Sequence, residues 1–344
     1  MQRRLTLQTK KLPKGTLRRS PSLVPNLFSP LEKLEWKAKN FGKYYTCTKV
    51  LGMGAQGTAI SLKNNVLPNR EVVAKLYNDT PKNRELVENE IAILKRLNAN
   101  GCKPFLLCFQ ENFVSNKDTL KGVCYLSGMT STYLVVVYDY FLGDGTTSLS
   151  SFISLPNPDN QSYITYETQD GGGDNFDGSK FVFSVIFTLL KAVDYMHKSG
   201  VAHLDLKPAN VIVNLAKEKV QLIDFGLSCM GELCQAGGTI PYMAKEVLRA
   251  IGNRELTLED AMLGDSWSIG VMIYQLINQT SPFRQVNVTE YVVGTMTQKD
   301  LLPSRYEEPP LEVAAVMNHI VDGFLRVEPQ ERLSVSTALE LLRK

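Results

Sequence analysis

Short apolar runs dominate the first part of the chain and predict a β-sheet. Five strands are expected, over residues 44–51, 58–62, 71–77, 105–113 and 132–139. A helix is predicted between the third and fourth strands, because Thr80 and Pro81 suit an N-cap and a first helical position and apolar residues follow at helical spacing. One helix among five strands predicts a small α+β lobe, which we place at residues 41–141.

Longer apolar segments follow in residues 142–344. Helices are expected over 181–198 and 335–342, and a small hairpin over 211–214 and 219–223. Residues 154–180 are rich in Gly, Pro, Asn and Asp, so we predict an inserted loop there that is either functional or disordered.

The first 40 residues differ from the rest in charge and pattern. Residues 1–30 hold seven Lys and Arg and no acid, so the remaining residues carry −4 against +3 for the whole chain. Such a segment buries too little apolar surface to offset the entropy of ordering, so we predict a mostly disordered basic arm with a short helix over 31–39. The arm is a candidate to bind an anionic partner or to target an organelle, and a solvated tail is the simpler alternative.

Composition limits the class of protein. With 344 residues and 44% hydrophobic content, the chain can form a sizeable core. No apolar run approaches the roughly 20 residues of a membrane-spanning helix. The six cysteines contain no CxxC pair and there are three histidines, which predicts neither a zinc module nor a disulfide framework and favours a reducing compartment.

The stretch His203-Leu204-Asp205-Leu206-Lys207-Pro208-Ala209-Asn210 carries the candidate chemistry. Asp205 could accept a hydroxyl proton, Lys207 could neutralise a moving phosphoryl group, and Asn210 could ligate Mg²⁺. A surface turn of the same composition is the alternative. Asp224, in Asp224-Phe225-Gly226, follows an apolar run and supplies a second possible metal carboxylate. The two motifs together predict a phosphate-transfer site.

A glycine-rich turn and a lysine within an apolar strand precede this stretch. Gly52, Gly54 and Gly57 lie between two predicted strands, where glycine lets backbone N–H groups approach phosphates. A tight hairpin is the alternative, and a dinucleotide-binding fold would have a helix after the last glycine. Lys75 needs an anionic partner unless it faces solvent from an edge strand, and ATP phosphates with a helix carboxylate would supply one.

These motifs resemble the eukaryotic-type protein kinase family, whose catalytic loop reads His-Arg-Asp with a following Asn and whose metal-binding turn reads Asp-Phe-Gly. The resemblance covers residues 41–344. It implies an α+β, two-lobed protein-kinase fold, with a small five-stranded antiparallel lobe and hinge over 41–141 that holds one main helix, and a larger, mainly helical lobe over 142–344. It also implies ATP and Mg²⁺, or Mn²⁺, as cofactors.

The resemblance assigns further site residues. Glu90 on the predicted helix would pair with Lys75, with Glu88 as the alternative, and Tyr138 would be the gatekeeper at the back of the adenine pocket, followed by a hinge over 139–142. The metal ligands would be Asn210 and Asp224, and the catalytic residues Asp205, Lys207 and Asn210. The implied nucleotide site comprises Gly52, Gly54, Gly57, Ala59, Ala74, Lys75, Glu90, Tyr138, Asp139 and Phe141.

Two positions depart from the family pattern. Leu204 stands where the family has the arginine that would pair with a phosphate on the activation segment, which implies activity without phosphorylation of that segment. Lys245 replaces a proline before Glu246 near the end of the same segment. Other positions match: Asp265 belongs to the helix that anchors the catalytic loop, and Arg332 is expected to pair with Glu246.

The implied branch is the serine/threonine one. Lys207 and Pro208 resemble that branch, and Thr239 corresponds to its threonine that contacts the catalytic aspartate, with a local capping role as the alternative. The function implied is transfer of the ATP γ-phosphoryl group to Ser/Thr hydroxyls of protein substrates.

Two other functions compete with this one. A pseudokinase would be a binding module on the same fold, and the retained Lys75, Asp205, Asn210 and Asp224 argue against it. A small-molecule phosphotransferase also uses an Asp and an Asn in its catalytic loop, but residues 239–246 and 265–270 favour a site for protein substrates. We expect a cytoplasmic protein that binds no nucleic acid.

Overall fold

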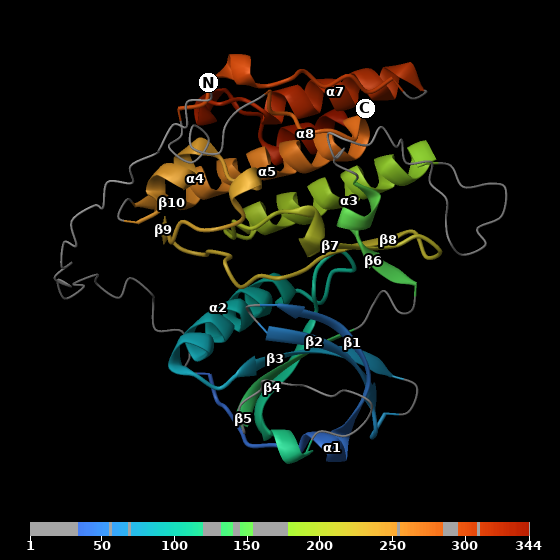
Figure 1. Ribbon diagram of the computed structural model, residues 1–344, viewed down its shortest axis with the longest axis vertical. Helices are drawn as coiled ribbons and strands as arrows, with labels where there is room; N and C mark the ends of the chain where they lie inside the picture. The colour runs from blue at the N-terminus through green and yellow to red at the C-terminus, as the bar shows by residue number, and fades with distance from the viewer. Residues whose placement is uncertain are drawn as a thin grey trace, which may run out of the picture. The chain divides into compact units, whose positions relative to one another are not determined.

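The small lobe of the computed structural model is a five-stranded antiparallel sheet, drawn at the bottom of Figure 1. The strands follow the order β1-β2-β3-β5-β4, and their bounds are β1 Tyr45–Gly54, β2 Gly57–Asn64, β3 Glu71–Asn78, β4 Phe109–Asn116 and β5 Thr132–Asp139. All five predicted strands exist. The fourth is displaced from the predicted 105–113: it begins at Phe109 and ends at Asn116, because the chain turns at residues 104–105 and Leu106 bridges Leu222 of the other lobe.

Side chains alternate across this sheet and give it two apolar faces. One face buries Leu76 and Val135 in a cluster with Phe41 of helix α1 (Phe41–Tyr44). The opposite face carries Tyr77 and Tyr138, whose cluster continues into the core of the large lobe. The second face is therefore the one that meets the candidate site.

The structure describes residues 34–54, 57–67, 70–119, 132–139, 145–153, 178–252, 255–284, 295–307 and 310–343. The folded unit begins at Leu34, seven residues before the predicted boundary at 41. Residues 34–40 are extended, with Ala38 bridging Val114 and the Lys39 amide donating to the Val114 carbonyl at 2.9 Å. The helix predicted over 31–39 is wrong in its described part, because this segment pairs with the free edge of β4. Residues 1–33 of the predicted arm, 1–40, lie outside the described residues.

Helix α2 (Pro81–Asn98) is the main helix of the small lobe. Its N-cap forms as predicted, since the Thr80 side chain accepts a hydrogen bond from the Asn83 amide and Pro81 occupies the first turn. Val87 and Ile91 are fully buried on its inner face. Local capping and apolar spacing thus determined this helix.

Helices make up most of the large lobe, at the top of Figure 1. They are α3 Gly178–Lys198, α4 Lys245–Ala250, α5 Leu258–Asn278, α7 Leu311–Phe324 and α8 Val335–Leu341. Helix α3 begins at Gly178, so the predicted insert at 154–180 overlaps it by three residues, and residues 154–177 lie outside the described residues. Helix α5 is the most buried of these helices, with Trp267, Ile269 and Ile273 in the core.

Short strands and single turns complete the lobes. Strands β6 (Thr146–Ser148), β7 (Val211–Asn214) and β8 (Lys219–Leu222) form one antiparallel sheet, and β9 (Leu233–Cys234) pairs with β10 (Leu256–Thr257). The hairpin of β7 and β8 confirms the predicted one. The 3-10 turns are η1 Lys117–Thr119, η2 Leu149–Phe152, η3 Pro208–Asn210, η4 Ile240–Tyr242, η5 Gln298–Asp300 and η6 Pro329–Glu331.

Two disulfides between described residues correct the prediction that the chain has no disulfide framework. Cys102 pairs with Cys108, and Cys229 with Cys234, across Cα distances of 5.3 and 5.6 Å. Each pair closes a short turn, so its geometry depends on backbone folding that residue spacing alone does not reveal. Among the described residues, no group of three or more His, Cys, Asp or Glu is arranged to hold a metal ion.

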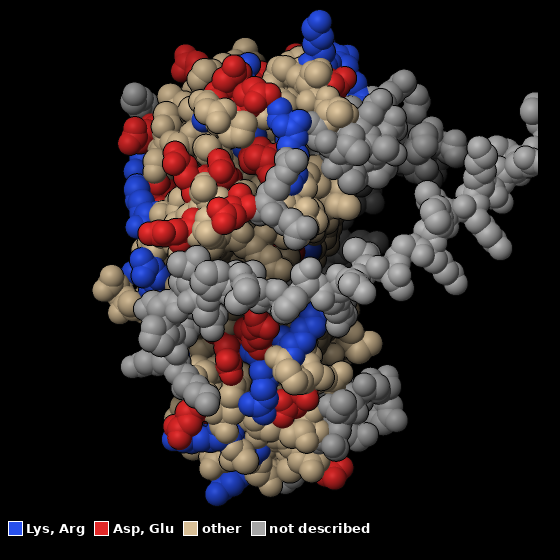
Figure 2. All heavy atoms as spheres, turned by 90° about the vertical axis from the view of Figure 1, so that its left-hand side faces the viewer, with Lys and Arg blue, Asp and Glu red and all other residues tan. Residues whose placement is uncertain are grey.

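The described helices include none that is long and apolar enough to cross a membrane. Figure 2 shows acidic and basic side chains interspersed over one face of the molecule, with acidic groups gathered over its upper, large-lobe part. This face therefore carries mixed charge.

Candidate active site

The catalytic loop, residues 203–210, connects α3 to β7 and is anchored by Asp265 of α5. The two oxygens of this carboxylate accept hydrogen bonds from the backbone amides of His203 at 2.7 Å and Leu204 at 2.8 Å. Asp265 is fully buried and also lies 3.0 Å from Nε2 of His197. These bonds hold Leu204 at a φ of 64°, a conformation uncommon for residues other than glycine. The predicted anchoring role of the helix is thus present in the structure.

Three polar side chains, those of Lys207, Asn210 and Thr239, converge on the Asp205 carboxylate. Its Oδ2 accepts from Nζ of Lys207 at 2.7 Å and from Nδ2 of Asn210 at 3.2 Å. Its Oδ1 accepts from Oγ1 of Thr239 at 2.7 Å, and Lys207 Nζ also donates to that hydroxyl at 2.9 Å. The structure therefore brings together Asp205, Lys207 and Asn210, and it contains the contact between Thr239 and Asp205 that the resemblance implies.

Gly238 lets the activation segment, residues 224–246, approach the catalytic loop. Its φ is +132°, and a Cβ atom there would lie 2.4 Å from the backbone oxygen of Leu204. A larger residue would collide with that carbonyl and adopt an unfavourable backbone conformation. Thr239 can reach Asp205 because the preceding residue is glycine.

Lys75 of β3 forms an ion pair with Asp224, with Nζ 2.8 Å from Oδ1. Burial disfavours the Lys75 ammonium, but the charges of Glu90 and Asp224 raise the pKa of Lys75 above its usual value. Burial likewise disfavours the Asp224 carboxylate, but the charge and hydrogen bond of Lys75, with smaller contributions from His203 and Lys207, lower the pKa of Asp224. Both groups are therefore charged at neutral pH, and their pair joins the two lobes.

Glu90 of α2 is 2% exposed and accepts two tyrosine hydroxyls. Tyr77 donates to its Oε2 at 2.7 Å and Tyr138 to its Oε1 at 2.9 Å. The predicted ion pair between Lys75 and Glu90 is replaced in this structure by the pair with Asp224, although the Glu90 charge still acts on Lys75. The alternative partner, Glu88, accepts from the Trp36 indole at 2.9 Å. Of the two helix carboxylates, Glu90 is the one that faces the site.

The predicted phosphate loop joins β1 to β2. Gly52 pairs with Ala59 and Gly54 with Gly57, while residues 55 and 56 lie outside the described residues. Gly57 has a φ of +143°, and a Cβ atom there would lie 2.6 Å from the Leu76 backbone oxygen. The hairpin thus requires glycine at its second strand, next to β3.

Ala74 was predicted to line the nucleotide site, but the structure places its side chain elsewhere. It precedes Lys75 on β3, so its side chain points to the opposite face of the sheet, where it is fully buried in the cluster around Phe41. Val73 shares the face of Lys75 and was missed. Ala59 pairs with Lys75 across β2 and β3 and lies on the site face, as predicted. The two-residue alternation of the strand was the signal that identifies Val73.

Asp139 is the one residue of the predicted hinge, 139–142, that the structure describes. Asp139 ends β5, and its carboxylate lies 2.5 Å from the guanidinium of Arg70 and accepts from Gln110 at 2.8 Å. Its side chain is therefore engaged with neighbouring strands, and its backbone is the part that could face a nucleotide. Phe141 and the other residues of 140–144 lie outside the described residues.

Asn210 and Asp224 suit a magnesium ion. The Ile223 amide donates to the Asn210 backbone oxygen at 2.9 Å. Asp224 follows Ile223, so this hydrogen bond brings the backbone segments of the two predicted ligands side by side. The side-chain nitrogen of Asn210 donates to Asp205. The Oδ1 atom of Asn210 is therefore the atom that could ligate a cation. Carboxylate and amide oxygens are ligands that Mg²⁺ accepts, and Mg²⁺ usually keeps several waters and binds substrate phosphates. The residues present therefore fit this ion.

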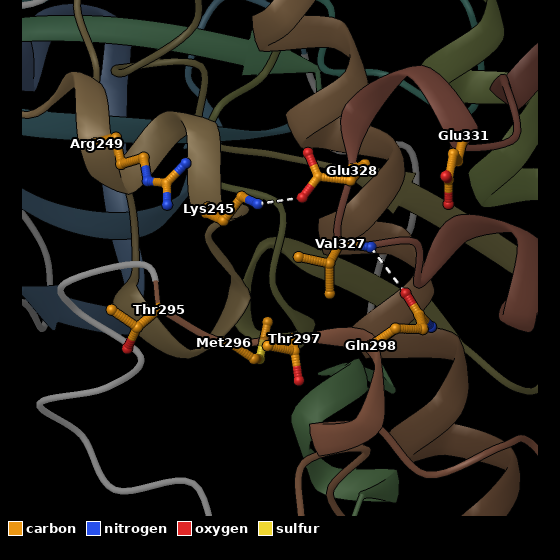
Figure 3. Close-up of a pocket in the computed structure, with 9 residues that line it drawn as sticks. All are labelled: Lys245, Arg249, Thr295, Met296, Thr297, Gln298, Val327, Glu328 and Glu331. Carbon is orange, nitrogen blue, oxygen red and sulfur yellow. Dashed lines mark hydrogen bonds and ion pairs between the residues drawn. The ribbon is translucent and has the colours of Figure 1, made fainter.

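A cavity of about 460 Å³ lies in the large lobe away from these residues (Figure 3). Lys245 and Glu328 form an ion pair of 2.5 Å at its wall, and the Val327 amide donates to the Gln298 side chain at 3.0 Å. The cavity contains none of the predicted catalytic residues. Lys245, the residue that replaces the family's proline, instead joins α4 to the segment before η6.

The predicted pair of Glu246 and Arg332 is confirmed. The Arg332 side chain is fully buried, and its two terminal nitrogens donate to the two Glu246 oxygens at 2.6 and 3.3 Å. It also donates to the Leu263 backbone oxygen at 2.6 Å. The pair fixes the end of the activation segment to the base of the large lobe.

Comparison with known families agrees with this geometry. The family model described as the protein kinase domain matches residues 45–342. The chain belongs to the protein kinase family. The expected fold is confirmed, with an antiparallel five-stranded lobe and a mainly helical lobe.

Several curated relatives of this kinase-family chain match it in part. A probable myosin light chain kinase of Dictyostelium discoideum is 32% identical over 157 residues, covering 44% of this chain and 49% of the relative. The SNF-related serine/threonine-protein kinase of Rattus norvegicus is 31% identical over 188 residues, covering 50% of this chain and 23% of the relative. The CBL-interacting serine/threonine-protein kinase 5 of Arabidopsis thaliana is 32% identical over 154 residues, covering 43% of this chain and 32% of the relative. The matched segments thus span less than half of each relative.

Proposed function

We propose that this chain is a serine/threonine protein kinase that transfers the γ-phosphoryl group of ATP, with Mg²⁺, to Ser and Thr hydroxyls of protein substrates. The observation that carries the proposal is the cluster at Asp205, in which Lys207, Asn210 and Thr239 converge on one carboxylate. The relatives named as serine/threonine kinases support the same branch.

In the proposed mechanism, Asp205 orients the acceptor hydroxyl and takes its proton. Lys207 stabilises the negative charge on the group being transferred, and Thr239 keeps both side chains in place. Lys75 contacts the phosphates of the nucleotide when these displace its bond to Asp224. Mg²⁺, held by Asp224 and Asn210, would supply positive charge at the phosphates.

The direct test is phosphorylation of generic protein substrates with labelled ATP and Mg²⁺. Asp205→Asn and Lys75→Met should each lower the rate by about 10²–10⁴-fold, because each removes a group that acts on the reacting atoms. Asp118→Asn, which alters an exposed acid on η1, serves as the matched control. Equal phosphorylation by the wild type and all variants would contradict the proposed enzymatic activity. A protein that binds substrate but transfers no phosphate would favour the pseudokinase alternative.

Phosphoamino-acid analysis of the product separates the remaining possibilities. We expect phosphoserine and phosphothreonine. Phosphotyrosine alone would overturn the assignment to the serine/threonine branch, and transfer to small alcohols but not to proteins would favour a small-molecule phosphotransferase.

We also propose that activity does not require phosphorylation of the activation segment. Leu204 is buried in the apolar core, where it offers no charge to a phosphate. Ser228 is the one hydroxyl residue between Gly226 and Gly237. It is 3% exposed and donates to the His203 backbone oxygen at 3.3 Å. Phosphatase-treated protein should keep its activity; activity that returns only after phosphorylation of this segment would contradict the proposal.

The partners and location of this kinase remain proposals. We propose protein substrates as its partners and an anionic surface as the target of the basic arm. The sequence favoured the cytoplasm as its compartment, whereas the disulfides Cys102–Cys108 and Cys229–Cys234 favour an oxidising one. Deletion of residues 1–33 should abolish binding to anionic vesicles or polyanions if the arm has this role, and it should leave activity on generic substrates unchanged.

A further inference from the structure

Two tyrosines and one glutamate form a buried cluster between the sheet and α2. Lys75 and Tyr77 lie on the same face of β3 because they are two residues apart. Tyr138 of β5 pairs with Val73 of β3, so it lies on that face as well. Glu90 reaches this face from α2 and accepts both hydroxyls, at 2.7 and 2.9 Å. Three secondary-structure elements therefore meet at one carboxylate.

The two hydroxyls satisfy a carboxylate that is otherwise withdrawn from water. A buried charge without donors is strongly destabilising, and hydrogen bonds to charged groups are stronger than those between neutral groups. Tyr77 and Tyr138 are 4% and 2% exposed. Burial first, and then the charge of Glu90, raise the pKa of both tyrosines well above its usual value. Both therefore stay protonated as donors at neutral pH.

Lys75 does not hold Glu90 directly. Its ammonium is bonded to Asp224 at 2.8 Å, and it lies 5.2 Å from the centre of the Tyr77 ring. Glu90 nevertheless stays close enough for its charge to raise the pKa of Lys75. The inward position of α2 is thus maintained while Lys75 has a different partner.

Other contacts of α2 agree with a fixed inward position. Asn89 donates to the Ser228 backbone oxygen at 3.0 Å, which links the helix to the activation segment. On the outer side of the helix, Glu88 accepts from Trp36 at 2.9 Å. The helix is therefore held at both sides while Glu90 points into the lobe.

We propose that Tyr77 and Tyr138 are positioning residues that clamp Glu90 and keep α2 inward independently of Lys75. This inference rests on the proposed kinase function, because α2 matters there for the alignment of the phosphates by Lys75. It supplies a physical basis for activity without a phosphorylated activation segment, since the clamp needs no phosphate. The hydroxyls, rather than the rings, carry the effect.

Tyr77→Phe, Tyr138→Phe and the double variant test the clamp, because each removes a hydroxyl and keeps its ring. Tyr133→Phe is the matched control: it lies on β5, is fully buried on the other face, and loses a bond of 3.3 Å to the Asn116 backbone oxygen. We expect kcat to fall about 3- to 10-fold for each single variant and about 30- to 100-fold for the double variant. The KM for ATP should change less than about twofold, and the control should match wild type.

A second readout does not depend on activity. The chain has two tryptophans, and Trp267 is 1% exposed, so acrylamide quenching reports mainly on Trp36 beside α2. The quenching constant should rise in the double variant and stay unchanged in Tyr133→Phe. If the wild type is inert, the proposed function fails, and quenching still decides whether the hydroxyls hold the helix.

Three outcomes would overturn the clamp. They are unchanged quenching in the double variant, unchanged or increased kcat, and an equal loss in Tyr133→Phe. If the double variant does not fold, the two single variants decide the matter through the same measurements.

Discussion

At the scale of single residues, the Thr239 hydroxyl connects the two charged groups of the catalytic loop. It donates to Asp205 at 2.7 Å and accepts from Lys207 at 2.9 Å. Removing a hydrogen bond to a charged group costs about 1.5–3 kcal/mol. Because this threonine lies on the activation segment, it also makes the geometry of Asp205 depend on the path of that segment.

Thr239→Ala should therefore lower kcat about 10- to 100-fold, since a free energy of 1.4 kcal/mol corresponds to about tenfold in rate. Thr239→Ser keeps the hydroxyl and should retain most of the activity. Steady-state kinetics of the two variants check this expectation. Equal kcat values for Thr239→Ala and wild type would mean that the contact does not align Asp205.

At the scale of secondary-structure elements, buried polar side chains connect the helices and loops of the large lobe. Asp265 of α5 holds the catalytic loop, and Arg332 holds the start of α4 through Glu246. Breaking a buried ion pair by removing one partner leaves an uncompensated charge and costs about 3–5 kcal/mol.

Glu246→Ala should destabilise the protein by about 3 kcal/mol, because it leaves the fully buried Arg332 side chain without its carboxylate. Urea unfolding followed by circular dichroism measures this change. Glu331→Ala removes an exposed acid one residue from Arg332 and should change stability by less than about 0.5 kcal/mol. A loss of similar size in both variants would contradict the assignment.

The disulfide between Cys229 and Cys234 closes a turn that leads into β9, which pairs with β10. The Cys229 backbone also bridges Ala202, next to the catalytic loop. A crosslink over so short a loop is worth about 2 kcal/mol by loop entropy, so Cys234→Ser should lower stability by about that amount. Peptide mapping after alkylation without reductant should find the two cysteines linked; alkylation of both would disprove the bond.

At the scale of the whole molecule, the described lobes are joined by an ion pair as well as by a continuous apolar core. Lys75 belongs to the small lobe and Asp224 to the large one, and the same two groups are proposed to meet the nucleotide. The side chains are 17% and 24% exposed, so solvent screening weakens the pair and we expect a modest contribution to stability.

This contribution should depend on pH in a defined direction. The folded pKa of Asp224 is lowered from 3.8, so its stabilisation is complete above that value and is lost as pH falls through the folded pKa. The folded pKa of Lys75 is raised from 10.5, so its contribution is complete below that value. From about pH 5 to 9, the free energy of unfolding of the wild type should exceed that of Asp224→Asn by about 1–2 kcal/mol. This difference should shrink below about pH 4. Urea midpoints that keep the full difference at pH 3 would contradict this.

The sequence by itself predicted most of the elements and the residues that meet at the candidate site. Strand alternation, the Thr80 cap and the spacing of Asp205, Asn210 and Asp224 are local signals, and they predicted the five strands, the main helix and the catalytic cluster. Thr239 and Arg332 were predicted from resemblance, and their partners are those expected.

Only the tertiary structure decided which partner each buried group takes. Lys75 bonds to Asp224, and Glu90 to Tyr77 and Tyr138, because these side chains come close only when α2 packs on the sheet and the lobes meet. The cysteine pairing and the start of the folded unit at Leu34 also depend on contacts between separate segments of the chain. No pattern within a single segment reveals such contacts. Periodicity reports which face of an element is buried, whereas a hydrogen-bond partner depends on distances between elements, which periodicity does not contain.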